Sequence, residues 1–179
     1  WTAQLAANTA ARSAGTPLHG IITEPFFHMF THIGGSGLTW PLVIMFLFSA
    51  SKQLKSIGKI ELIPAIFNIN EPIMFGAPLV LNPIMFIPFI LSPAVAVTVN
   101  YIAFYSGIVP KIVMQPPFTV PVFFGGIIAT GGYWQGAALQ LVNLILSALI
   151  YFPFFKLFEK QLVINAKKAE LEIENGEQV

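Results

Sequence analysis

Long apolar runs, separated by short polar or proline-rich stretches, make up most of this chain. The runs 38–50 (with the glycines before it), 84–107 and 138–155 approach the ~20 apolar residues that a membrane-spanning α-helix needs. We therefore expect three transmembrane helices. Residues 1–20 are small and polar and predict a short helix or loop at the membrane surface.

Two further stretches are apolar but contain too many prolines and glycines for a regular helix. In 60–83, prolines recur at positions 64, 72, 78 and 83, and 115–132 combines Gln115-Pro-Pro with two Gly-Gly pairs. We expect both to be re-entrant hairpins, the first with its tip near residues 70–72. The predicted fold class is an all-α membrane protein of transmembrane helices with proline-broken re-entrant hairpins. Full crossings by both 60–83 and the Pro116 region would also leave the C-terminal tail inside, with Lys111 moved to that side, so the charge distribution alone does not decide between the two topologies.

Lysines mark the expected cytoplasmic side. Lys52, Lys55 and Lys59 follow the first run, and further lysines follow the last one, whereas Lys111 stands alone between the runs. The positive-inside rule places the lysine clusters in the cytoplasm and Lys111 outside. The tail 159–179, rich in Lys and Glu, is expected to be a solvated cytoplasmic helix that frays at its end.

Composition supports a membrane protein. Hydrophobic residues make up 55% of the chain, charged residues 9%, and mean hydropathy is +0.74. The apolar composition predicts membrane lipid as a partner, and the net charge of +1 implies no nucleic-acid or acidic partner. There is no cysteine in these 179 residues, so any cysteine nucleophile must come from elsewhere. The chain begins without Met and is expected to be part of a longer one.

The most informative stretch is I-F-N-I-N-E-P-I-M-F-G-A-P-L-V-L-N-P, residues 66–83. It sets one carboxylate, Glu71, in apolar surroundings, where an ionised group is costly unless it has partners or water. Asn68, Asn70 and Asn82 add amide donors and acceptors nearby. A functional site at Glu71 is the hypothesis that follows.

Other polar residues have open roles. Glu24, in T-E-P, is explained equally well as a helix start or as a site residue. His28 and His32 share one helical face and could bind a metal, but no third ligand lies near in sequence, so neither metal nor cofactor is expected. The role of His19 is also open. Gly34 to Gly37 should allow close approach of a helix or a ligand.

These motifs together resemble a known family. I-I-T-E-P-F-F, I-G-G-S-G, the Asn68–Pro83 stretch, A-T-G-G-Y-W and L-Q-L-V-N-L are similar to the lactose/cellobiose family of enzyme IIC permeases, the membrane subunits of the bacterial sugar phosphotransferase system. The resemblance covers the C-terminal half of such a permease. It implies a substrate-binding half at 1–158, a cytoplasmic tail at 159–179, and a multi-pass protein of the bacterial inner membrane with a cytoplasmic C-terminus.

The resemblance also implies a chemistry. Glu71 is similar to the family's sugar-binding carboxylate and would act as the catalytic base, with Asn68, Asn70 and Asn82 as further substrate-binding residues. The substrate would be a β-linked disaccharide or β-glucoside of the cellobiose, chitobiose or lactose type. A phosphocysteine on a separate IIB subunit would donate the phosphate. His19-Gly20 repeats a family dipeptide in the wrong place, so His19 receives no role.

Further partners implied by the resemblance are the upstream half of the same permease and, at full length, a second copy in a homodimer. The chain would then be part of the membrane subunit of a phosphoenolpyruvate-dependent sugar phosphotransferase, inactive on its own. Aromatic rings at Phe67, Phe75, Phe118 and Trp134 could pack against a pyranose. The alternative function is a proton-coupled secondary sugar transporter in which Glu71 carries the proton. A membrane scaffold explains Glu71 least well.

Overall fold

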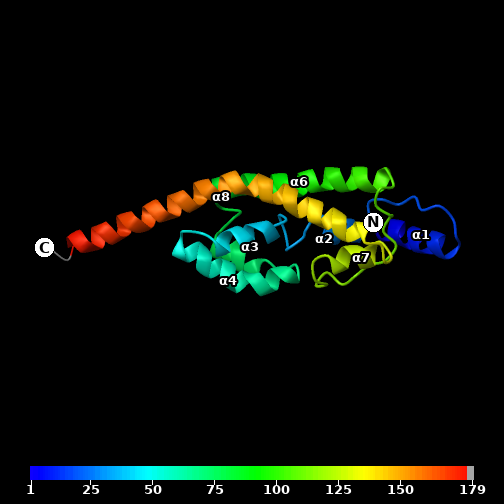
Figure 1. Cartoon of the computed structure of the whole chain (residues 1–179), viewed down its shortest axis with the longest axis horizontal. Coiled ribbons are helices and arrows are strands. Elements are labelled where there is room, and N and C mark those ends of the chain that lie inside the picture. The colour runs from blue at the N-terminus through cyan, green and yellow to red at the C-terminus, as the bar shows by residue number, and fades with distance from the viewer. Residues whose placement is uncertain (177–179) are drawn as a thin grey trace.

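The computed structural model describes residues 1–176 as an elongated, entirely helical protein (Figure 1). Eight helices follow one another: α1 Thr2–Ser13, α2 Glu24–Phe30, α3 Trp40–Leu47, α4 Lys52–Ile66, α5 Glu71–Gly76, α6 Pro83–Tyr105, α7 Phe124–Ala129 and α8 Gln135–Gly176. Over this range there is no β-strand, and the predicted all-α class is confirmed. The N-terminal helix α1 also agrees with the prediction.

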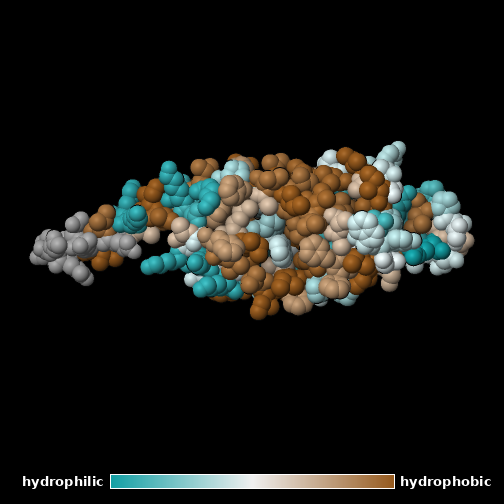
Figure 2. Space-filling view, in the orientation of Figure 1, coloured by the Kyte–Doolittle hydropathy of each residue, from teal (hydrophilic) through white to brown (hydrophobic). Residues whose placement is uncertain are grey.

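Two helices are long and apolar enough to cross a membrane. They are α6, with 23 residues, and the stretch Gln135–Ile173 of α8. At ~1.5 Å per residue, α6 is about 35 Å long, which is sufficient for the ~30 Å hydrocarbon layer. The two helices pack along each other and are joined by a buried hydrogen bond between side-chain amides. Asn143 Nδ2 of α8 donates to Asn100 Oδ1 of α6 at 2.7 Å. Their outer sides form a continuous apolar surface between hydrophilic ends (Figure 2).

The prediction of a third spanning helix at 38–50 was wrong. Helix α3 has only eight residues, about 12 Å, and the seven-residue α2 precedes it across a non-helical connection. Gly34, Gly35 and Gly37 adopt positive φ in that connection, and so does Leu38 at +56°. This backbone cannot continue a right-handed helix, so α2 and α3 form one broken helix.

The first proline-rich stretch forms a helical hairpin, as predicted. Helix α4 ends at Ile66, residues 67–70 form the tip, and the six-residue α5 follows. At about 22 Å and 9 Å, neither helix reaches across a hydrocarbon layer. The tip lies two residues before the predicted position, because Pro72 occupies the first turn of α5 instead of the turn itself.

The second proline-rich stretch is also non-helical at Gln115–Pro121 and includes only one short helix, α7. The Gly125-Gly126 pair lies inside α7. The two hairpin regions touch, since Val122 N donates to the Ile66 carbonyl at 3.1 Å.

The main apolar core lies where α3, α4, α5 and α8 meet. Its fully buried members include Phe46 of α3, Leu54 of α4, Ile73 of α5 and Tyr151 of α8. The Tyr151 hydroxyl donates to the Gly37 carbonyl at 2.8 Å. The long helix α8 thus supports both the broken helix and the hairpin.

The helix that contains the last apolar run, 138–155, does not end at Phe155. Helix α8 continues through Pro153 and past Lys156 without a break, so no change of backbone marks the predicted boundary between 158 and 159. Residues 177–179 of the expected tail lie outside the described range. The charged part of the tail extends the helix because Lys and Glu are good helix formers.

The basic residues lie at opposite ends of the molecule. At one end, Ser49 Oγ donates to Glu159 Oε1 at 2.7 Å, which joins the turn before Lys52 to the lysine-rich part of α8. At the other end, Lys111 Nζ donates to the Leu18 carbonyl. In the predicted topology, the positive-inside rule requires the lysine clusters and Lys111 to lie on opposite sides of the membrane, and their positions at opposite ends of the molecule meet this requirement.

We therefore expect single cysteines introduced at Lys55 and Lys160 of the full-length protein to react with an impermeant maleimide only from the cytoplasmic side. A cysteine at Lys111 should react only from outside. Labelling is measured in right-side-out and inverted vesicles, after any cysteine outside this chain has been replaced. Reaction of all three positions from one side would contradict the topology.

Candidate functional site

The hairpin tip is held by its asparagines. Asn68 adopts φ +61°, a left-handed conformation that Asn tolerates better than most residues. Its side chain accepts a hydrogen bond from Gly34 N at 3.0 Å and donates to the carbonyls of Phe118 and Val120 at 2.8 and 3.1 Å. The Asn68 side-chain amide therefore joins the hairpin tip to the break between α2 and α3 and to the loop 115–121.

Asn70 makes a second connection. Its side chain is buried and donates to the Ser36 carbonyl at 2.7 Å and to Thr39 Oγ1 at 3.0 Å. A Cβ atom added to Gly35, which has φ +93°, would overlap the Asn70 amide. The prediction that the glycine run allows a close approach is thus confirmed, and the approaching group is the hairpin tip.

Asn82 lies away from the tip, at the start of α6. Its Oδ1 accepts from Ile84 N at 2.9 Å and from Met85 N at 3.3 Å, so it caps the helix. This amide oxygen is engaged within the protein. A sugar-binding role for Asn82 stays a prediction, as it does for Asn68 and Asn70.

Glu71 differs from the asparagines. It is the first residue of α5, is exposed, and makes no hydrogen bond or ion pair with any of residues 1–176. The structure thus holds the tip rigidly through Asn68 and Asn70 and leaves the Glu71 carboxylate available to a ligand.

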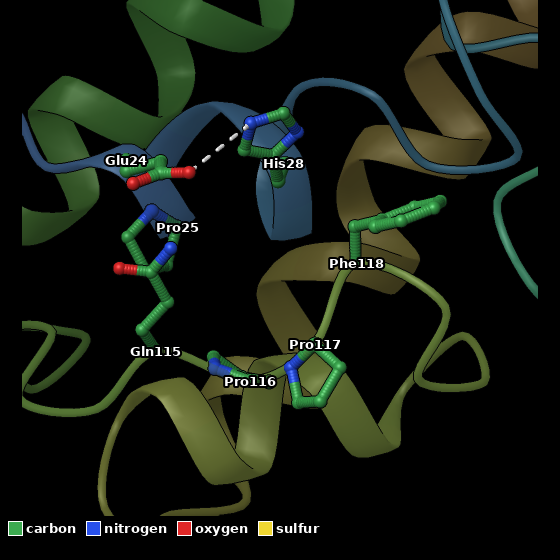
Figure 3. Close-up of a pocket in the computed structure, with 7 residues that line it drawn as sticks. All are labelled: Glu24, Pro25, His28, Gln115, Pro116, Pro117 and Phe118. Carbon is green, nitrogen blue, oxygen red and sulfur yellow. Dashed lines mark ion pairs between the residues drawn. The ribbon is translucent and has the colours of Figure 1, made fainter.

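A cavity of about 490 Å³ opens beside the tip (Figure 3). It is lined by Glu24, Pro25 and His28 of α2 and by the loop 115–118. A smaller hollow of about 120 Å³ shares His28 and Phe118 with it and reaches Asn68. The two hollows bring α2, the glycine run and the hairpin tip together. Glu71 lines neither of them.

Three of the residues with open roles, Glu24, His28 and His32, line these two hollows. Glu24 opens α2, where Thr23 precedes it without a capping side-chain bond, and Glu24 Oε1 lies 3.8 Å from His28 Nε2 (Figure 3). The imidazole rings of His28 and His32 lie 6.0 Å apart, centre to centre. Residues 1–176 hold no group of three His, Cys, Asp or Glu residues that could bind a metal ion. His19 lines neither of these hollows.

Of the four aromatic candidates, Phe118 reaches the cavity wall. Trp134 lies instead in an apolar groove between α6 and α8. Phe75 is 83% exposed, and Phe67 is partly exposed at the hairpin tip. Only Phe118 therefore combines an accessible ring with polar neighbours, the arrangement that a sugar ring requires.

Comparison with known proteins agrees with this geometry. The family model described as "Phosphotransferase system, EIIC" matches residues 1–93, the part that includes α2, the glycine run and the whole hairpin. The chain belongs to this family. An EIIC permease is an integral membrane protein of bacteria, in agreement with the two long apolar helices.

Individual EIIC proteins are similar over almost the whole chain. The lichenan permease IIC component of Bacillus subtilis (strain 168) is 45% identical over 96% of this chain and 38% of its own length. The lactose-specific EIICB component of Lacticaseibacillus casei is 33% identical over 97% of this chain and 30% of its own. The crystal structure of ChbC, the IIC component of an N,N'-diacetylchitobiose-specific phosphotransferase system, superimposes with a TM-score of 0.89 and 40% identity. That superposition covers 93% of this chain and 39% of ChbC. The chain spans less than half the length of these relatives.

Sequence reasoning missed one residue of this EIIC hairpin. Glu61 of α4 is completely buried, and its Oε2 accepts a hydrogen bond from Ile73 N of α5 at 2.9 Å. Its other oxygen, Oε1, is buried without a hydrogen-bond partner in the part of the chain that the structure describes. The available signal was a lone Glu within I-E-L-I-P, ten residues before Glu71.

Proposed function

We propose that this chain is the substrate-binding, C-terminal part of an EIIC permease that moves a sugar across the bacterial inner membrane and presents it for phosphorylation. The observation that carries this proposal is the free carboxylate of Glu71 on a hairpin tip fixed by Asn68 and Asn70. Many transporters form their substrate sites from broken helices near the middle of the bilayer, and the broken helix α2–α3 and the hairpin have this character. Family membership favours this function over the proton-coupled alternative.

The substrate we propose is a β-linked disaccharide or β-glucoside. The names of the similar permeases support this class, since they specify lichenan, lactose and N,N'-diacetylchitobiose. The cavity beside the tip offers a carboxylate, an imidazole, an amide and the Phe118 ring. Such a combination suits hydroxyl groups on one side of a pyranose and C–H groups on the other.

In the reaction that we propose, the Glu71 carboxylate accepts the proton of a sugar hydroxyl while that oxygen attacks phosphorus. An O–P bond forms and the S–P bond of a phosphocysteine breaks, and the thiolate leaves. The donor that the resemblance implies is a phosphocysteine of a IIB component, and this chain has no cysteine of its own. The name EIICB of the lactose relative supports a partnership between the two components. As the resemblance implies, we also propose that this chain works together with the upstream half of the same permease and that the full-length protein forms a homodimer. Its C-terminus is proposed to lie in the cytoplasm.

The experiment that tests this function is sugar uptake by the full-length protein in vesicles. Uptake should require phosphorylated IIB inside the vesicle, deliver sugar phosphate, and continue when a protonophore collapses the proton gradient. This chain alone, lacking the upstream half, should show neither activity. Uptake of unmodified sugar that stops with the protonophore would favour Glu71 as a proton carrier and overturn the proposal.

A further inference from the structure

Glu61 occupies a position that helix geometry reserves for an apolar residue. The buried residues of α4 are Leu54, Gly58, Glu61 and Ala65, spaced four, three and four apart, which is the core-facing side of a helix. Three of these positions hold apolar or small residues, and the fourth holds a carboxyl group. Burial of a carboxyl group is costly, so packing alone does not explain it.

The Glu61 carboxyl group supplies what α5 lacks. Asn70 occupies the N-cap position of α5 but makes no capping bond, because its amide is directed to Ser36 and Thr39. The third residue of α5, Ile73, donates its amide to Glu61 Oε2 instead. Helix α4 therefore caps α5 from outside, in place of the N-cap side chain.

The capped turn is the one that begins with Glu71. Ile73, two residues later, is fully buried in the main core, so its amide is a fixed point of this turn. Glu61 thus acts on Glu71 through this turn, because its hydrogen bond to Ile73 N anchors the turn on which Glu71 lies.

We propose that Glu61 is a positioning residue that fixes the first turn of α5 and so sets the direction in which Glu71 meets the sugar. This inference rests on the proposed role of Glu71. It assigns no contact between Glu61 and the substrate.

The test uses the full-length permease and two matched variants. Glu61→Leu keeps the approximate size and removes the hydrogen-bond acceptor, whereas Glu61→Gln keeps an acceptor oxygen for Ile73 N. We expect Glu61→Leu to lower kcat for phosphotransfer from phosphorylated IIB by roughly ten-fold or more, because the Ile73 amide loses its acceptor and the turn that begins with Glu71 is no longer anchored. Glu61→Gln should restore most of the rate. Equal rates for Glu61→Leu and wild type would overturn the inference.

Two further measurements separate this inference from the proposed function. Glu61→Leu should add little to the defect of Glu71→Gln, since a positioning residue acts through the residue that it positions. Hydrogen exchange of the amides 72–75 should speed up in Glu61→Leu and return towards wild type in Glu61→Gln, whatever Glu71 does. Normal activity of Glu71→Gln with this exchange pattern would sink the proposed function and leave the anchoring intact. Unchanged exchange in Glu61→Leu would sink the anchoring itself.

Discussion

Glu71→Gln in the full-length permease is expected to lower sugar affinity by roughly ten- to a hundred-fold. A hydrogen bond to a charged acceptor contributes about 1.5–3 kcal/mol, and glutamine keeps the shape and one oxygen while it removes the charge. The Glu71 carboxylate has no partner among residues 1–176, so the exchange leaves no group in this part of the chain unpaired. Isothermal titration with the sugar measures the loss.

Phosphorylation should fall further than affinity. General-base assistance contributes about 10²–10⁴-fold, and an amide cannot accept the hydroxyl proton. The rate of sugar phosphate formation from phosphorylated IIB, measured at saturating sugar, isolates this second loss. Folding should survive, because Asn68 and Asn70 hold the tip without help from Glu71.

The control is Glu24→Gln. Glu24 also precedes a proline and opens a short helix, but it lines the cavity beside His28, whereas Glu71 lines neither hollow. Its exchange should change phosphorylation much less than that of Glu71. Wild-type binding and phosphorylation by a well-folded Glu71→Gln protein would make the carboxylate structural, and the function built on it would have to be abandoned.

The hairpin could be predicted from sequence because its signals are local. Prolines at 64, 72, 78 and 83 exclude a regular helix, and the two asparagines before Glu71 mark a turn. The break between α2 and α3 could not be predicted from hydropathy, because glycine is compatible with an apolar run and the positive φ angles arise only in the folded chain. The apolar run at 38–50 therefore predicted one crossing where the structure has a short helix.

The site was only partly predictable for a related reason. An amide in an apolar stretch signals a buried hydrogen bond, but the sequence does not say whether the partner is a sugar or the protein's own backbone. The partners of Asn70 lie 31 and 34 residues away, and a partner of Asn68 lies 52 residues away. Glu61 was missed because its partner, the Ile73 amide, has no signature in the sequence.

The second large effect that we expect is the loss of stability and sugar binding when the contact between the glycine run and the hairpin tip is disrupted by Gly35→Ala. Gly35→Ala places a Cβ atom on the Asn70 amide and forces a non-glycine residue to φ +93°. The backbone strain costs about 1–3 kcal/mol, and displacement of Asn70 endangers two hydrogen bonds that contribute about 1 kcal/mol each. We expect the full-length protein to lose about 2–5 kcal/mol of stability, measured as thermal unfolding in detergent, together with most of its sugar binding.

Gly132→Ala is the matched control for this change. Gly132 has φ +99°, close to that of Gly35, but a Cβ atom there would meet nothing within 4 Å. It should therefore show the cost of strain alone and keep its affinity for sugar, because it lies in the turn after α7, away from the contact with Asn70. The difference between the two variants isolates the contact between Gly35 and Asn70. Equal losses of stability in the two variants, with sugar binding retained in both, would show that the glycine run is needed only for its own backbone conformation. The hairpin tip bearing Glu71 would then be positioned without the contact between Gly35 and Asn70.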